Sequence, residues 1–142
     1  MKPSLSRPKR QLAVIINYGC IVLLLLFFYL GYRFDWSLPI IAGLVFTALV
    51  GVVSFMILHL NTRLWRMVHS KADELDERQL MVTRESLRYS YGIFTVVSLV
   101  VLLLVAVLGG WRDSLLMLIF ASLLYLAHTL PASILAWREK EI

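Results

Sequence analysis

The sequence predicts an all-α fold: an integral membrane four-helix bundle, built from two hairpins that a cytoplasmic helical connector, residues 61–90, joins. Composition gives the first reason, because the 142 residues are 60% apolar and have a mean hydropathy of +0.80, far above a soluble domain of this size. The second reason is that four apolar stretches are each long enough to cross a bilayer. The third is a single polar stretch between the second and third of them. We expect residues 1–142 to form one membrane domain.

The four predicted spans contain no Asp, Glu, Lys or Arg, and each has about the 20 residues that a helix needs to cross about 30 Å of hydrocarbon. They cover residues 12–32, 38–60, 91–109 and 114–137. A cleaved signal peptide is an alternative for the first span, because a basic tail precedes it. Its apolar run is longer than a signal core, however, and no Ala-x-Ala-like cleavage site follows, so we expect the span to remain.

Basic residues fall on one predicted side of the membrane. Of the 14 Lys and Arg residues, the two outer turns hold only Arg33 and Arg112; the tail, the central segment and the C-terminal end hold the others. Short loops rich in Lys and Arg resist translocation, so we expect a plasma-membrane protein with both termini and the central segment in the cytoplasm. The net charge of +5 fits this topology and attraction to anionic lipid. Because acidic residues interleave with the basic ones, we expect no nucleic-acid partner.

The first two spans carry residues that suit helix packing. Asn17 is an amide near hydrocarbon, and we expect it to make an interhelical hydrogen bond rather than to bind a ligand. In the second span, Gly43, Thr47 and Gly51 recur every four residues and place small side chains on one face. Such a face lets another backbone approach closely, which favours packing. A pore lining is the alternative interpretation of this stripe.

The central stretch, residues 71–91, holds five of the nine acidic residues and no Gly or Pro. We therefore expect a helix that runs into the third span. Ser70, followed by Asp73, resembles a capping box and predicts the start of that helix. Glu85 and Arg88 are three residues apart and can pair on the helix surface.

We expect this stretch to meet a protein partner, because the short outer turns leave little other surface outside the membrane. Its charges have both signs on one helix, and complementary charge governs partner choice and encounter rate. The candidate docking residues are Asp76, Glu77, Arg78, Arg84 and Arg88. The alternative is a solvated connector that only maintains the topology.

Part of the same stretch resembles a known pattern. Two acidic residues and an arginine are followed by a valine, a further arginine and two serines directly before an apolar span. These residues are Asp76, Glu77, Arg78, Val82, Arg84, Ser86 and Ser90. The pattern is similar to the D-E-R motif that precedes a hydrophobic hairpin in families of small uncharacterised bacterial and archaeal multi-pass membrane proteins. The resemblance implies a topology rather than an activity.

His128, in the fourth span, is the candidate for a buried functional side chain. We expect it to be a neutral histidine that hydrogen-bonds and packs within the bundle. Haem ligation is disfavoured, because His59 lies at a different depth and cannot supply the second axial ligand. The sequence has no Gly-rich phosphate loop, no His-Glu-x-x-His motif and no nucleophile elbow. We therefore predict no enzyme activity, no cofactor and no metal site.

Two classes of function fit these features. One is a non-catalytic accessory subunit, or a regulatory or docking module, of a larger membrane complex. The other is a small transporter or channel formed by oligomerisation. The first is favoured, because no span contains the carboxylate that proton-coupled transporters usually carry at mid-depth. The expected partners are the lipid bilayer, other membrane or cytoplasmic subunits and further copies of this chain.

Overall fold

The computed structural model describes residues 6–60, 64–71, 75–108 and 113–138, and within them the chain is all-helical without any strand. The elements are α1 (Arg7–Phe34), α2 (Leu38–Phe55), the π-helix η1 (Met56–Leu60), α3 (Leu64–His69), α4 (Glu77–Leu108) and α5 (Asp113–Arg138). Four helices are long and apolar enough to cross a membrane, namely α1, α2 with η1, α4 and α5. The predictions of an all-helical chain and of four long apolar helices are therefore confirmed.

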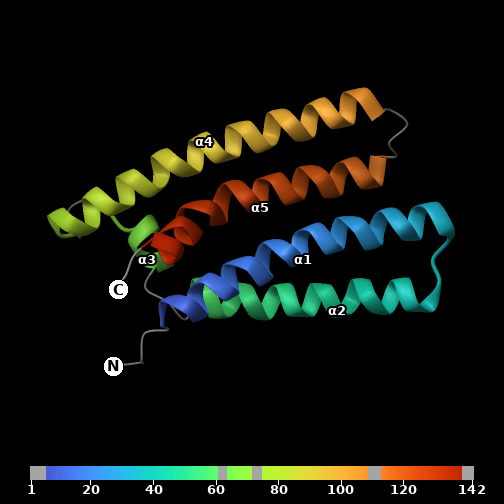
Figure 1. Cartoon of the computed structure of the whole chain (residues 1–142), viewed down its shortest axis with the longest axis horizontal. Coiled ribbons are helices and arrows are strands. Elements are labelled where there is room, and N and C mark those ends of the chain that lie inside the picture. The colour runs from blue at the N-terminus through green and yellow to red at the C-terminus, as the bar shows by residue number, and fades with distance from the viewer. Residues whose placement is uncertain (1–5, 61–63, 72–74, 109–112, 139–142) are drawn as a thin grey trace.

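The long helices lie side by side in the order α2, α1, α5, α4 (Figure 1). α1 packs on both α2 and α5, whereas α4 packs on α5. The short α3 contacts α5, α4 and η1 at the end of the molecule where α1 begins and α5 ends. We term this end the α3 end, and the opposite end, which holds the α1–α2 turn, the far end.

The turn between α1 and α2 is tight at the far end. Asp35 has a φ of 66°, a left-handed conformation that ends α1, and Pro39 lies in the first turn of α2, where its missing N–H costs little. The ring of Trp36 folds back onto Gly31, and a Cβ added to Gly31 would lie 2.6 Å from it. Only a glycine leaves room for this ring.

The central helix begins later than the sequence predicts. α4 starts at Glu77 rather than after Ser70, and Asp73 lies outside the described residues. The Oδ1 atom of Asp76 accepts a hydrogen bond from Gln79 N at 2.7 Å, and Gln79 Oε1 accepts one from Asp76 N at 3.3 Å. This reciprocal capping box sets the helix start. The predicted continuity with the third span is confirmed, because α4 runs unbroken through it.

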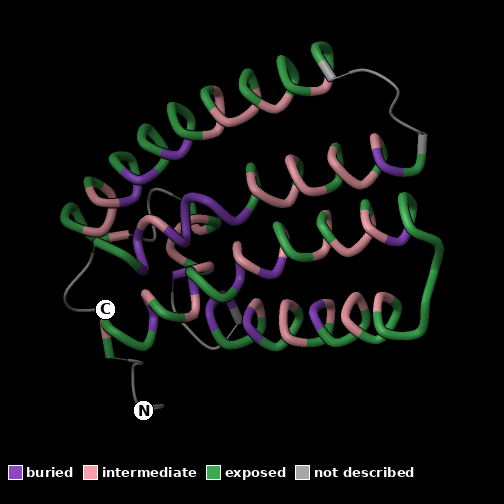
Figure 2. Tube along the Cα trace, turned by 45° about the vertical axis from the view of Figure 1, so that its right-hand side comes forward, coloured by how far each residue is buried: buried purple, intermediate pink, exposed green. Residues whose placement is uncertain are grey.

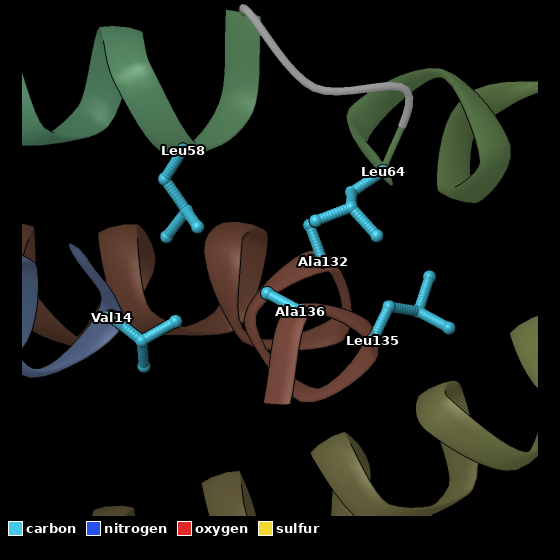
Figure 3. Close-up of a cluster of buried hydrophobic side chains, with 6 residues drawn as sticks. All are labelled: Val14, Leu58, Leu64, Ala132, Leu135 and Ala136. Carbon is cyan, nitrogen blue, oxygen red and sulfur yellow. The ribbon is translucent and has the colours of Figure 1, made fainter. Parts of the chain in front are cut away.

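Buried apolar side chains are concentrated at the α3 end. Figure 2 shows most of the buried positions gathered there. Figure 3 shows side chains from α1, η1, α3 and α5 that converge on one another. They are Val14, Leu58, Leu64, Ala132, Leu135 and Ala136. The first turns of α1 and the last turns of α5 are thus held together with the short elements between them.

Polar contacts join α1 to its neighbours. The amide of Asn17 is buried, and its Oδ1 accepts a hydrogen bond of 3.0 Å from the hydroxyl of Tyr125 on α5. Ser54 of α2 donates a hydrogen bond of 2.9 Å to the carbonyl of Ala13. Each of these polar groups thus finds its partner on another helix.

The stripe of small residues on α2 faces α1. Thr47 is buried there. A Cβ added at Gly43 would lie 2.7 Å from the ring of Phe27, and one added at Gly51 would lie 3.4 Å from the Cβ of Cys20. The absence of side chains at the two glycines allows this close approach of α1 to α2.

Replacing Gly51 with leucine is expected to lower the free energy of unfolding by about 1–3 kcal/mol, because an oversized side chain forces its neighbours apart. Thermal unfolding in detergent measures this loss. Gly51→Ala is the matched control and should stay near the wild type, since its Cβ would be 3.4 Å from Cys20, an ordinary contact distance. Unchanged stability of Gly51→Leu would contradict the packing of this stripe on α1.

Candidate functional site

Two features at the α3 end are candidates for function: the exposed face of α4 and a cluster of rings around Trp65. The first half of α4 packs through small hydroxyl residues, since Thr83, Ser86 and Ser90 are buried. Ser86 Oγ donates to the carbonyl of Thr83 at 2.9 Å, and Ser90 Oγ donates to the carbonyl of Ser86 at 2.6 Å. Because both hydroxyls are satisfied within their own helix, this face can approach α5 closely.

The opposite face of α4 is exposed. It carries Glu77, Met81, Arg84, Arg88 and Tyr91, whose spacings alternate between four and three residues. This spacing places all five in one line along the helix. We term this line the α4 seam. Its two apolar side chains are among the most exposed of the molecule, at 70% for Met81 and 75% for Tyr91.

The candidate docking residues are all exposed, but they have different positions. Glu77, Arg84 and Arg88 belong to the α4 seam, whereas Arg78 lies one position further round the helix. Asp76 forms the capping box of α4 through its carboxylate. A change at Asp76 therefore affects the helix start as well as the surface charge.

Glu85 and Arg138 attach the first half of α4 to α5. Their ion pair joins Oε1 to Nη1 at 3.1 Å, and the guanidinium also lies 4.7 Å from the ring centroid of Tyr89. The prediction that Glu85 pairs with Arg88 is thus wrong for the described residues, because the carboxylate turns to α5 while Arg88 points outward along the seam. A pairing between distant segments gives no local spacing signal in the sequence.

α4 is longer than a membrane crossing requires. Its 32 residues extend over about 48 Å at about 1.5 Å per residue, compared with about 30 Å of hydrocarbon in a bilayer. Figure 1 shows that the excess lies at the α3 end, where α4 reaches past the start of α1 and the end of α5. Glu77, Met81, Arg84 and Arg88 of the α4 seam lie on this protruding part, and Tyr91 lies where the predicted third span begins.

All three histidines of the chain meet at Trp65. Their ring centroids lie 5.3 Å (His59), 4.3 Å (His69) and 4.8 Å (His128) from that of the indole. His69 and His128 are also 5.3 Å apart, and Phe55 stacks on His59 at 4.7 Å. These five residues, which we term the Trp65 cluster, connect α2, η1, α3 and α5.

The three histidines differ in their surroundings. His59 is fully buried, and neither ring nitrogen has a hydrogen-bond partner among the described residues. His69 is exposed, and its Nδ1 lies 2.9 Å from the carbonyl of Trp65, so this nitrogen carries the proton.

His128 is exposed rather than buried, and the buried histidine is His59. The π-helix η1 buries both Leu58 and His59. Single-turn π-helices are frequent at functional sites, but no residue pattern in the sequence identifies this one.

The described residues provide no metal centre. No group of three or more His, Cys, Asp or Glu side chains within them is placed to hold an ion. The rings of the Trp65 cluster pack between helices, and the α4 seam is an exposed surface of mixed charge and apolar character.

Comparisons of this chain with models of protein families, with curated proteins and with solved structures gave no match. The resemblance of the Asp76–Arg78 motif to families of small membrane proteins therefore stays a prediction. Any functional conclusion rests on the geometry described above.

Proposed function

We propose that this protein is a non-catalytic, multi-pass protein of the plasma membrane whose α4 seam docks another protein subunit on the cytoplasmic side. In this proposal α1, α2 with η1, α4 and α5 form a four-helix membrane bundle. The protein is then an accessory or regulatory member of a larger complex, which the membrane helices anchor and the protruding part of α4 contacts.

Exposed apolar surface supports insertion into the bilayer. Large side chains on the outer faces of the long helices are mostly exposed, for example Val22 at 65%, Phe46 at 69% and Leu124 at 72%. Water disfavours continuous apolar surface of this kind, whereas acyl chains accommodate it. The backbone of each helix satisfies its own hydrogen bonds, as a membrane-spanning segment requires.

The distribution of positive charge supports a cytoplasmic α3 end. Arg7, Lys9 and the arginines of the α4 seam lie at this end, whereas Arg33 lies at the far end. An excess of Lys and Arg marks the side of a membrane protein that is not translocated. The α4 seam then faces the cytoplasm.

The observation that carries the docking proposal is the composition of the protruding seam. Met81 is 70% exposed between Glu77 and Arg84 on a part of α4 that exceeds the bilayer thickness. Met81 with the charged residues on either side of it resembles a protein interface, which has an apolar core and a polar rim. Because this surface carries charges of both signs, it is selective for a partner with complementary charges.

Reversing the three seam charges tests this proposal. The variant Glu77→Arg, Arg84→Glu, Arg88→Glu should lower partner recovery from native membranes about tenfold or more, because repulsion replaces complementary charge. Recovery is measured by quantitative mass spectrometry of co-purified proteins at low and high salt. Asp76 stays unchanged, since it caps α4.

The matched control reverses exposed cations elsewhere at the α3 end, as Lys9→Glu with Arg66→Glu. This variant should leave the partner in place. Equal recovery from the seam variant and the wild type would refute docking through the α4 seam.

A further inference from the structure

A groove lies at the α3 end between α1 and α4, with α5 as its floor. Its volume is ≈ 470 Å³, and residues of all three helices line it. Its walls are mainly apolar, with Val14 from α1, Ile93 from α4, and Leu130 and Ile134 from α5. A site of this shape and size accommodates a single flexible hydrocarbon chain.

The polar groups inside the groove are already satisfied. The hydroxyl of Tyr18 donates a hydrogen bond of 2.9 Å to Ser133 Oγ and lies 3.3 Å from Thr129 Oγ1. Ser133 Oγ donates in turn to the carbonyl of Thr129 at 3.0 Å. Because these groups bond to one another, an occupant at this depth does not have to supply a polar partner.

The mouth of the groove is cationic. Arg138 lines it and uses Nη1 for the ion pair with Glu85, while its side chain stays 46% exposed. Arg7 also reaches this rim, since its Nε donates to the carbonyl of Trp137 at 3.3 Å. Among the described residues Glu85 pairs with Arg138 alone, whereas Arg7 contacts a backbone carbonyl, and a guanidinium matches a phosphate in charge and geometry.

The aromatic side chains at the mouth fix its depth in a bilayer. Tyr89 and Trp137 line the same end of the groove as Arg138. Tyrosine and tryptophan favour the headgroup level of a membrane, so the apolar walls lie at the level of the acyl chains. The groove therefore has the polarity profile of one lipid molecule, with an anionic head and an apolar tail.

We infer that this groove binds an anionic phospholipid of the leaflet at the α3 end. One acyl chain lies between α1 and α4 against Leu130 and Ile134, and the phosphate lies against Arg138 and Arg7. The inference rests on the membrane insertion proposed above but not on the docking partner, so a purified protein suffices to test it.

Native mass spectrometry of the full chain in detergent measures the binding directly, with phosphatidylglycerol and phosphatidylcholine of the same acyl chains as probes. The wild type should retain phosphatidylglycerol about five-fold better, as expected for one additional contact between a cation and an anionic lipid. Arg138→Gln should remove most of this preference. Arg33→Gln, the same substitution at the far end, should preserve it.

Two further variants separate lipid binding from a structural role of the ion pair. Glu85→Gln breaks the ion pair but frees Arg138, so it should raise the retention of phosphatidylglycerol, whereas a purely structural role would lower it. Ile93→Trp narrows the groove and should reduce the retention of both lipids.

Three results would overturn the inference. They are equal retention of both lipids by the wild type, an equal effect of Arg33→Gln and Arg138→Gln, and a dimer of the chain without any lipid adduct. The last result would show that a second copy fills the groove. None of them bears on docking through the α4 seam, because no partner protein is present.

Discussion

Replacing Trp65 with alanine is expected to lower the free energy of unfolding by about 3 kcal/mol, the cost of deleting a large ring from a packed site. The indole contacts all three histidine rings and also Phe55, whose centroid is 5.9 Å away. Its loss would leave a cavity where η1, α3 and α5 meet. Thermal or denaturant unfolding in detergent measures the effect.

Trp36→Ala is the matched control at the far end. Trp36 is 48% exposed and has its ring contact with Phe28 at 5.3 Å, so its loss should cost about 1 kcal/mol. Trp65→Phe should fall between the two alanine variants, because a smaller ring fills part of the space. Equal destabilisation by Trp65→Ala and Trp36→Ala would show that the Trp65 cluster does not hold this end together.

Cysteine labelling of intact cells should give an all-or-none difference between two positions. Phe34→Cys at the far end should react with a membrane-impermeant maleimide, whereas Met81→Cys on the α4 seam should react only after permeabilisation. Both native side chains are exposed, at 69% and 70%, so burial does not confound the comparison. Both variants are made in a chain that carries Cys20→Ser, because Cys20 is the one cysteine of the chain and its removal leaves only the introduced thiol to react.

Labelling of Met81→Cys in intact cells would place the seam outside and contradict a cytoplasmic docking surface. Failure of both positions to react before permeabilisation would contradict a four-span topology in which the far end is exposed on the outer side.

The four long helices are predictable from sequence because an uncharged apolar run of bilayer length is a strong signal by itself. Their ends are less predictable. α1 begins at Arg7 rather than at residue 12, because a helix continues beyond hydrocarbon wherever polar residues and a proline in the first turn permit it. The capping-box pattern at Ser70 predicts too early a start for α4, since Asp76 and not Ser70 forms the cap.

The surface of α4 could also be anticipated in part, because charged residues on a water-facing helix stay exposed. The Trp65 cluster and the groove between α1 and α4 could not be predicted from the sequence. The rings come from α2, η1 and α3 and from the distant α5, which no local spacing in the sequence brings together. The groove depends on the packing of α1, α4 and α5, and on a pairing of Glu85 with Arg138 that no local spacing reveals.

A photo-crosslinking amino acid at Met81 tests docking through the α4 seam most directly, because this side chain is 70% exposed at the centre of the proposed interface. Irradiated native membranes should give one discrete crosslinked protein from Met81, and none from a probe at Arg66, an exposed position of α3. Reversal of Glu77, Arg84 and Arg88 should abolish the product. A product that persists after this reversal, or that forms equally from Arg66, would contradict docking through the α4 seam.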